Sequence, residues 1–339
     1  MLFYPVLMFG GCPKIMEFNE YFKLILEADV SRFVRRTPLD LLCTTSDRLG
    51  FHVFSKRDDL QPTVYSFKIR GVAYKLSQLC NQQKITNLAL VVPSTGNHAI
   101  SVVHCARSLG YKVTVVMPTC TSDIKVNKVS SMGGEVILSG DSCSESCAAA
   151  EEIALKIKAT LVHPYDDPDI IVGHGTMARE IVEQLYYQQI KAIFVPIGGG
   201  ALASSVALYI KKVMPKTKVI GVQYHGCDSM RRSLQEGKIV SHKPLSTFAS
   251  AISTEYVGKE TFRICRELLD DVVVVRKEEV IDAIKEFYRH CRVVLEPAGA
   301  ASLAALGQWS KTSTSNKTDN VVTLACGANA DLNSIFNVY

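Results

Sequence analysis

The stretch "KAIFVPIGGGALASSVALYIKKVMP", residues 191–215, joins a short apolar run to a longer apolar segment through three consecutive glycines. We interpret the first run as a buried strand, Gly198–Gly200 as the turn that ends it, and residues 201–215 as a helix. The next apolar run, "KVIGVQ" at residues 218–223, predicts a second strand. A strand, a helix and another strand in this order are typical of a parallel β-sheet covered by helices.

Earlier residues repeat this alternation of short apolar runs and longer helical segments. Because buried parallel strands are continuously apolar, we expect an α/β fold with two such units. Strands are predicted at residues 87–93, 112–118 and 135–140, and helices at residues 98–110, 122–134 and 144–159.

The composition is that of an ordinary globular protein. The chain has 339 residues, which suggests roughly two domains. The formal charge is +5 and Lys and Arg form no cluster, so nucleic acid is not an expected partner. The 11 cysteines follow no disulfide spacing, which favours reduced thiols in a cytosol-like compartment.

No segment predicts a membrane span or a targeting signal. No apolar stretch reaches the roughly 18 residues that a spanning helix needs. The N-terminal "MLFYPVLMFGG", residues 1–11, is short, lacks a basic leader and contains Pro5, so we expect no signal peptide. We therefore expect a cytoplasmic protein, with an organelle as the alternative if a transit peptide precedes the sequence given.

The Gly198–Gly200 turn predicts an anion site. Consecutive backbone N–H groups at the start of a helix bind anions, and the helix dipole adds partial positive charge. A plain tight turn is the alternative, but three glycines after a buried strand favour phosphate. The pattern "GHGTMA", residues 173–178, matches a dinucleotide fingerprint only weakly, because no acidic residue ends the next strand.

Lys68 stands among apolar neighbours in "TVYSFKIRG", residues 63–71. A partly desolvated lysine has a lowered pKa, and its free amine is nucleophilic. The alternative is a surface lysine whose stem lies along a helix. Pyridoxal phosphate carries a phosphate group and a carbonyl that reacts with amines. The predicted phosphate site would suit the first and a nucleophilic lysine the second, so Lys68 is our candidate for the attachment of this cofactor.

Six blocks of sequence, in this order, resemble the fold-type-II pyridoxal-phosphate enzymes (the tryptophan synthase β-like fold). The resemblance is closest to the catalytic domain of the biosynthetic threonine dehydratases, with serine racemases and serine dehydratases as near relatives. The blocks are "KRDDLQPTVYSFKIRG" (56–71), "PSTGNHAIS" (93–101), "HPYDDPDIIVGHGT" (163–176), "VPIGGGALA" (195–203), "LEPAGAA" (295–301) and "LACGANADL" (324–332).

The resemblance implies an α/β fold of two open twisted sheets covered by helices. A large cofactor-binding domain would comprise residues 1–88 and 167–339, and a small domain, residues 89–166, would close over the substrate. The resemblance also implies a homo-oligomer, either a dimer or a tetramer.

The cofactor implied by the resemblance is pyridoxal 5′-phosphate. Lys68 would hold it as a Schiff base and act as the proton-transfer base, with Phe67 packed beside the ring. Asn97 would hydrogen-bond the pyridine 3-hydroxyl. The remaining contacts would be the phosphate site at Gly198, Gly199, Gly200 and Ala201, Glu296 near the ring edge, and Cys326 facing the pyridine nitrogen.

The substrate carboxylate would be held by backbone at the start of a helix, formed by Ser94, Thr95, Gly96, Asn97 and His98. Thr95 is also a catalytic candidate. Dehydratases usually have Ala at its position, and serine racemases have the Ser that serves the face opposite the lysine. Thr95 keeps the hydroxyl but adds a methyl group.

Other positions depart from the family pattern. Ser250-Ala251 stands where Asp-Gly is usual, and Ala201 replaces a fourth glycine, which a negative φ would tolerate. Cys326 replaces the usual Ser, as it does in liver-type serine dehydratases.

This sequence also departs from the family pattern at the positions where serine racemases have a cation site. Gln223, Cys227 and Ser229 stand at its positions, and without carboxylates a hard cation loses its main ligands. No metal is therefore expected.

The implied reaction is β-elimination of a hydroxy-amino acid, threonine or serine, to a 2-oxo acid and ammonia, catalysed by a dehydratase of the ammonia-lyase type. Lys68 would remove the α-proton. Three alternatives stay open. One is an amino-acid racemase, and another is a β-replacement enzyme, against which the Ser-Phe-Lys-Ile-Arg-Gly block argues. The third is a diverged paralogue without catalysis.

Overall fold

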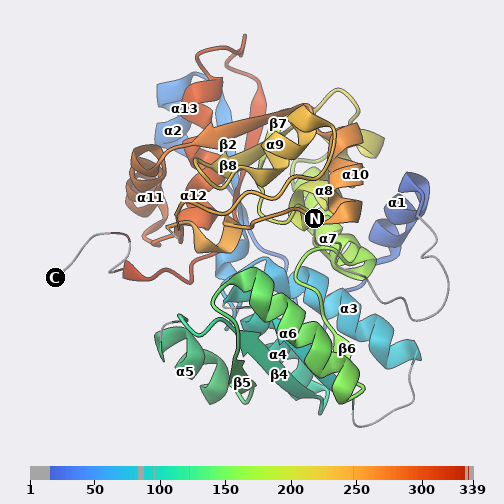
Figure 1. Ribbon diagram of the computed structural model, residues 1–339. Coiled ribbons are helices and arrows are strands. Elements are labelled where there is room, and N and C mark those ends of the chain that lie inside the picture. The colour runs from blue at the N-terminus through green and yellow to red at the C-terminus, as the bar shows by residue number, and fades with distance from the viewer. Residues whose placement is uncertain are drawn as a thin grey trace.

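The computed structural model describes residues 16–82, 88–94, 96–121, 123–246, 248–332 and 335. The apolar N-terminal segment discussed above and Thr95 lie outside the described residues. Two bodies are visible, one above the other, and each is built on its own sheet (Figure 1).

The larger sheet has six strands in the order β1-β2-β10-β7-β8-β9. Neighbouring strands pair in parallel except β1 and β2, which pair antiparallel. The strands are β1 (Leu39–Leu41), β2 (His52–Arg57), β7 (Ile190–Pro196), β8 (Lys218–Tyr224), β9 (Asp271–Val275) and β10 (Asn320–Ala325).

Helices cover both faces of this sheet. Successive residues of a strand point to opposite faces, and here the residues on both faces are buried. In β7, Ile193 and Val195 belong to one hydrophobic core, and Ala192 and Phe194 belong to the other. The first core also contains residues of α1 (Phe18–Glu27), α3 (Lys68–Gln82), α7 (Pro168–Gln184), α8 (Ala201–Val213), α9 (Ser229–Glu236) and α10 (Lys259–Leu268). On the other side lie α2 (Cys43–Leu49), η2 (Ser250–Ile252), α11 (Lys277–Cys291), α12 (Pro297–Ala304) and α13 (Leu306–Trp309).

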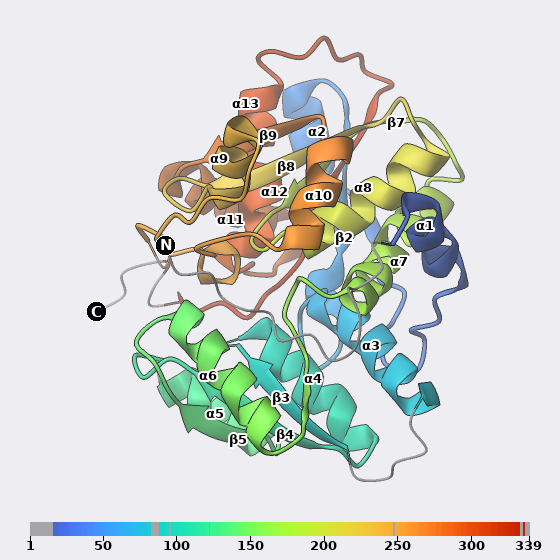
Figure 2. The ribbon, with the colours of Figure 1, turned by 45° about the vertical axis from the view of Figure 1, so that its right-hand side comes forward.

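The smaller sheet has four parallel strands in the order β5-β4-β3-β6, and it forms the lower body in both ribbon views (Figures 1 and 2). One face packs on α6 through Val91, Val116, Ala150 and Ala154. The other face joins the core that contains α3 and α7. Its elements are β3 (Ala89–Pro93), α4 (Asn97–Ser108), β4 (Lys112–Met117), α5 (Asp123–Ser131), β5 (Glu135–Leu138), α6 (Cys143–Lys156) and β6 (Thr160–Leu161).

This architecture confirms the predicted α/β fold with two helix-covered sheets. The predicted strands at residues 87–93, 112–118 and 135–140 correspond to β3, β4 and β5. The antiparallel β1–β2 pair is a difference from the parallel pattern, and a seven-residue helix, α2, connects its strands. Within the described ranges, no helix combines the length and the apolar composition needed to cross a bilayer.

The "GHGTMA" pattern lies inside α7 rather than at a turn between a strand and a helix. A Cβ on Gly173 would overlap the backbone oxygen of Arg70, so the glycine permits close packing of α7 on α3. The glycines of this pattern therefore serve helix packing. The match to a dinucleotide fingerprint is coincidental, because that fingerprint requires a turn between a strand and a helix.

Candidate active site

Lys68 is the first residue of α3, and its position is set by the chain that follows β10. The N–H of Phe67 donates to the carbonyl oxygen of Cys326 at 3.0 Å, and the N–H of Lys68 donates to Oγ of Ser66 at 3.3 Å. The lysine Nζ donates to the carbonyl oxygen of Pro164 at 2.8 Å. Lys68 thus lies at the carboxyl edge of the six-stranded sheet, where ligands bind in open α/β folds.

One pocket at this edge contains every predicted cofactor-binding residue. It brings together residues that follow strands of both sheets, since Asn97 and Tyr165 come after β3 and β6, and Gly198 and Cys326 come after β7 and β10. Its lining consists of Phe67, Lys68, Asn97, Tyr165, Pro196, Gly198, Gly199, Gly200, Ala201, Leu202, Ala251, Ile252, Glu296, Ala298 and Cys326.

The Lys68 ammonium is poorly solvated in this pocket. Burial lowers the pKa of Lys68 to about 8, although the nearby Glu296 favours the charged form. The centroid of the Phe67 ring lies 5.4 Å from Nζ of Lys68. A lysine with this pKa has a substantial fraction of free amine near neutral pH, which suits it to act as a nucleophile and base.

The predicted phosphate site is the N-terminus of α8. Gly200 precedes the 13-residue helix with a φ of 105°, a conformation that favours glycine, and a Cβ there would lie 2.8 Å from the Thr261 side chain. A Cβ on Gly199 would overlap the ring of Tyr165. Ala201 begins the helix and is not among the residues with positive φ, as its methyl group requires. The first N–H groups of the helix have no intrahelical acceptor, so this cradle can bind an anion.

Asn97 and Glu296 are hydrogen-bonded to each other in the pocket. Nδ2 of Asn97 donates to Oε1 of Glu296 at 2.6 Å, and Nδ2 of Asn329 donates to Oδ1 of Asn97 at 2.7 Å. Burial raises the pKa of Glu296 to about 7, against the effect of the Asn97 hydrogen bond. Asn329 was not predicted as a site residue, because no local signal in the sequence indicates its contact with Asn97.

Cys326 presents a neutral thiol to the pocket. Its side chain is buried, and Sγ donates a weak hydrogen bond to the carbonyl oxygen of Ala298 at 3.7 Å. Burial raises the pKa of the Cys326 thiol well above its ordinary value. The group is therefore uncharged and a weak donor over the whole neutral range.

The predicted substrate segment lies at the N-terminus of α4. Oγ of Ser94 accepts the N–H of Gly96 at 3.2 Å and the N–H of Ala99 at 3.3 Å. Asn97 begins the helix and lines the pocket, whereas Ser94, Gly96 and His98 are not among its lining residues. His98 is buried, with Nε2 3.1 Å from a backbone oxygen, and burial lowers its pKa to about 3.

Tyr165 is a pocket residue to which the sequence analysis assigned no role. It lies in the "HPYDD" segment that follows β6. In the same segment, the carbonyl oxygen of Pro164 accepts the hydrogen bond from Nζ of Lys68. The next residue, Asp166, accepts N–H groups of Lys259 and Glu260 at the start of α10. This cap fixes the segment over the glycine cradle, and only the tertiary structure reveals that position.

The first turn of α3, which begins with Lys68, also carries a buried ionic network through Arg70. Both ends of the Arg70 guanidinium contact Asp58, and both Nη atoms contact Glu180, at 2.7 and 2.9 Å. Lys56 donates to the same Glu180 at 2.6 Å. Arg70, Asp58 and Lys56 are all fully buried. The network therefore ties α3 to the end of β2 and to α7.

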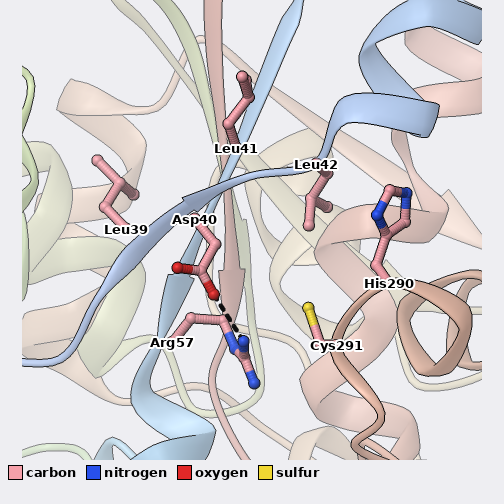
Figure 3. A pocket seen from close by; sticks show the side chains of 7 residues that line it. All are labelled: Leu39, Asp40, Leu41, Leu42, Arg57, His290 and Cys291. Carbon is pink, nitrogen blue, oxygen red and sulfur yellow. Dashed lines mark hydrogen bonds and ion pairs between the residues drawn. The ribbon is translucent and has the colours of Figure 1, made fainter.

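A second pocket lies at the β1 edge of the large sheet (Figure 3). Leu39–Leu42, Arg57, His290 and Cys291 line it. Arg57 is already paired there with Asp40, at 2.7 Å. This pocket contains none of the predicted site residues, so we place the candidate active site at Lys68.

Two of the three positions predicted to have lost a cation site, Gln223 and Cys227, make internal hydrogen bonds. Oε1 of Gln223 accepts the N–H of Arg231 at 2.8 Å, and Sγ of Cys227 donates to the carbonyl oxygen of Ser246 at 3.3 Å. Ser229 is buried, and its Oγ has no hydrogen-bond partner among the described residues.

Removal of divalent cations by EDTA is expected to change the rate of amino-acid turnover by less than about twofold, because these three side chains offer no carboxylate to a hard cation. The measurement is the initial rate before and after chelation. The control is readdition of magnesium. A large loss that magnesium reverses would contradict the prediction.

The fold and the pocket define a pyridoxal-phosphate enzyme of fold type II. The chain belongs to the pyridoxal-phosphate dependent enzyme family, whose model matches residues 30–327. A threonine dehydratase-like protein, AKTS1-1 of Alternaria alternata, is 36% identical over 94% of this chain and 77% of its own length. The biosynthetic L-threonine dehydratase IlvA of Pasteurella multocida is 38% identical over 93% of this chain and 60% of its own length.

Two solved structures illustrate the similarity of fold. The processed form of threonine deaminase isoform 2 from Solanum lycopersicum superposes with a TM-score of 0.87 at 36% identity, covering 97% of this chain and 88% of that one. Maize serine racemase superposes with a TM-score of 0.85 at 30% identity, covering 93% and 95%. The chain spans about half to three fifths of the length of the first curated threonine dehydratases that it matches.

The pocket fits the cofactor of this family. A glycine cradle at a helix N-terminus suits a phosphate, the poorly solvated amine of Lys68 suits a carbonyl, and the neutral Cys326 suits an uncharged pyridine nitrogen.

Proposed function

We propose that the protein catalyses the pyridoxal-phosphate-dependent β-elimination of threonine or serine to a 2-oxo acid and ammonia. The observation that carries the proposal is the position of Lys68, whose amine has a pKa of about 8 and shares one pocket with the glycine cradle of α8. The relatives named as threonine dehydratases support the same reaction. When bound, the cofactor supplies the electron-withdrawing group that acidifies the α-C–H of an amino acid.

Lys68 is the base in this proposal. Its Nζ removes the α-proton and keeps it within the pocket, close to the carbonyl oxygen of Pro164. Burial lowers the pKa of Lys68 to about 8, so roughly a tenth of the amine is unprotonated at pH 7, far more than for an ordinary lysine, and the base needs no further activating group.

The other pocket residues orient the reacting groups. The N–H groups of Gly198–Ala201 would hold the phosphate, and Asn97, at the start of α4, would contact the ring hydroxyl. Phe67 and Glu296, which line the same pocket, would contact the ring. Cys326 does not protonate the ring nitrogen, because its thiol stays neutral and donates only weakly. A residue that leaves the ring nitrogen unprotonated would favour elimination of the β-hydroxyl over transamination.

We also propose that residues 89–166 form the small domain that closes over the substrate, and that the backbone of residues 94–98 binds its carboxylate. The four-stranded sheet lies wholly within this range. Oγ of Ser144 on α6 donates to Oε2 of Glu255 at 2.6 Å, and Oγ of Ser241 donates to Oε1 at 2.8 Å. This hydrogen-bonded contact is consistent with a unit that meets residues 167–339 beside the pocket.

A homo-oligomer, dimer or tetramer, and a cytoplasmic location complete the proposal. Relatives named as mitochondrial or chloroplastic make an organelle the alternative location. Sedimentation of the purified chain tests the oligomer, and imaging of the tagged protein tests the location.

The test of the reaction uses the protein purified with pyridoxal phosphate. Visible absorbance reports bound cofactor, and a 2-oxo acid assay reports turnover of threonine, serine and other hydroxy-amino acids. We expect both signals. Absorbance without any 2-oxo acid from these substrates would show that the pocket is retained without the proposed reaction.

A serine racemase activity is the second candidate, because maize serine racemase is a structural relative and Thr95 offers a hydroxyl. Racemisation needs a proton donor on the face opposite Lys68, and a well-placed donor contributes about 10²–10⁴-fold. The β-branch of threonine restricts χ1, so its hydroxyl is less free to aim at the α-carbon than that of serine.

Elimination is therefore expected to dominate in the wild type. Thr95→Ala should leave elimination within about tenfold, equivalent to about 1.4 kcal/mol of barrier. Thr95→Ser should raise any racemisation. Chiral chromatography of serine and a 2-oxo acid assay on the same samples provide the measurement. If the wild type interconverts enantiomers faster than it forms 2-oxo acid, and Thr95→Ala stops only that, the protein is a racemase.

A further inference from the structure

His174 of α7 contacts the residues on both sides of Lys68. Its side chain is fully buried. Its ring lies against Phe67, with centroids 4.8 Å apart and an angle of 54° between the planes. Nδ1 accepts the backbone N–H of Gly71 at 3.1 Å. The histidine therefore touches the residue before the lysine and the first turn of the helix after it.

The hydrogen bond fixes the tautomer of the His174 ring. A neutral imidazole has one protonated nitrogen, and because Nδ1 accepts from Gly71, the proton is on Nε2. Burial lowers the pKa of His174 well below its ordinary value, and the charges of Lys68 and Arg70 and the neighbouring His98 act in the same direction. The ring therefore stays neutral and keeps its acceptor over the neutral pH range.

The acceptor satisfies a group that the helix itself leaves unpaired. Gly71 belongs to the first turn of α3, whose N–H groups lack intrahelical partners. The N–H of Arg70 donates to the carbonyl oxygen of Phe67 at 3.0 Å, and Gly71 donates to His174. A Cβ on Gly71 would lie 2.7 Å from Cε1 of the histidine, so the approach requires glycine.

We propose that His174 is a positioning residue for Lys68: its bare Nδ1 caps the first turn of α3, its ring braces Phe67, and it adds no positive charge beside the lysine. The proposal rests on the proposed function of Lys68 but concerns a residue outside the pocket lining. The buried network of Arg70 anchors the same turn from the other side, so the lysine is held between two attachments to α7.

The test compares His174→Leu, which has no acceptor, with His174→Gln, whose Oε1 can accept the Gly71 N–H. The control is His290→Leu. His290 is a half-buried histidine of α11 that lines the other pocket (Figure 3), and like that of His174 its Nε2 has no partner among the described residues. All proteins are compared with cofactor bound and without substrate.

Two readouts report the position of the lysine rather than stability. We expect the Gly71 amide of His174→Leu to exchange about 10–100-fold faster, the effect of losing a buried hydrogen bond. We also expect the pH midpoint of the visible absorbance to move by at least about half a unit. His174→Gln should restore both, and His290→Leu should match the wild type.

If His174→Leu does not fold, nitrogen NMR of the wild-type histidine rings decides the question. We expect His174 to be neutral, with its proton on Nε2, over the neutral pH range. A proton on Nδ1 would overturn the proposal, as would wild-type exchange and titration in His174→Leu, or a Gln variant as impaired as the Leu variant. These readouts need no turnover, so they stand apart from a failure of the proposed reaction.

Discussion

Lys68→Ala is expected to abolish turnover and to remove the visible absorbance of the bound cofactor. The loss of rate should be at least about 10²–10⁴-fold, the usual share of general acid–base catalysis alone, because the attachment group is lost as well. Among the described residues, Lys68 is the only lysine that lines the pocket, so no other lining lysine can replace it. An absorbance scan and a 2-oxo acid assay on the same preparation measure both effects.

The matched control is Lys112→Ala, a change of an exposed lysine on β4 outside the pocket. It should leave absorbance and turnover at wild-type values. Retained absorbance in Lys68→Ala, with the protein folded, would mean that another lysine binds the cofactor and that the site is misassigned.

Arg70→Met is expected to destabilise the protein by about 3–5 kcal/mol, because removing one partner of a buried ion pair leaves uncompensated buried charge. Asp58 is fully buried and Glu180 largely so, and both would lose the guanidinium. Chemical denaturation at pH 7 measures the change in the free energy of unfolding.

The difference in the free energy of unfolding between the wild type and Arg70→Met should become smaller as the pH falls. Burial alone would raise the pKa of Asp58, but in the wild type Arg70 and Lys56 outweigh burial and hold this pKa below its ordinary value. The carboxylate therefore stabilises the wild type above that ordinary value, and this contribution is lost on acidification through the folded pKa. In Arg70→Met burial dominates, so protonation of Asp58 begins at higher pH and relieves the variant.

An exposed ion pair provides the comparison. Lys23 and Glu27 lie 4.0 Å apart on α1 with side chains 74% and 61% exposed, so Glu27→Gln should change stability by no more than about 1 kcal/mol. A cost for Arg70→Met no larger than that of Glu27→Gln would show that the buried network is not needed for stability.

The strands and helices were predictable where the sequence carries a local pattern. The apolar run before Gly198 could only be a buried strand, and three glycines with an apolar helix behind them indicate an anion site at its end. These two features depend on neighbours in sequence, so composition and period suffice to find them. For Lys68 the neighbouring residues left a surface lysine open, and it was the resemblance of the six sequence blocks to the fold-type-II pyridoxal-phosphate enzymes that selected it.

Contacts between distant segments were decided by the tertiary structure alone. Asn97 and Glu296 are 199 residues apart in sequence, and neither position carries a local signal for the other. Tyr165 reaches the cradle because a segment after β6 crosses to the other sheet and is capped on α10.

The sequence by itself therefore determined the fold class and the glycine cradle, because hydrophobic period and turn chemistry are local properties, and its six family-like blocks selected the candidate lysine. Only the tertiary structure decided what holds that lysine. The "GHGTMA" glycines looked like a ligand turn but serve close packing of α7 on α3, and His174 between them caps the turn of Lys68. Gly71 and His174 are 103 residues apart in sequence. Such roles arise only when helices that are distant in sequence pack within van der Waals contact.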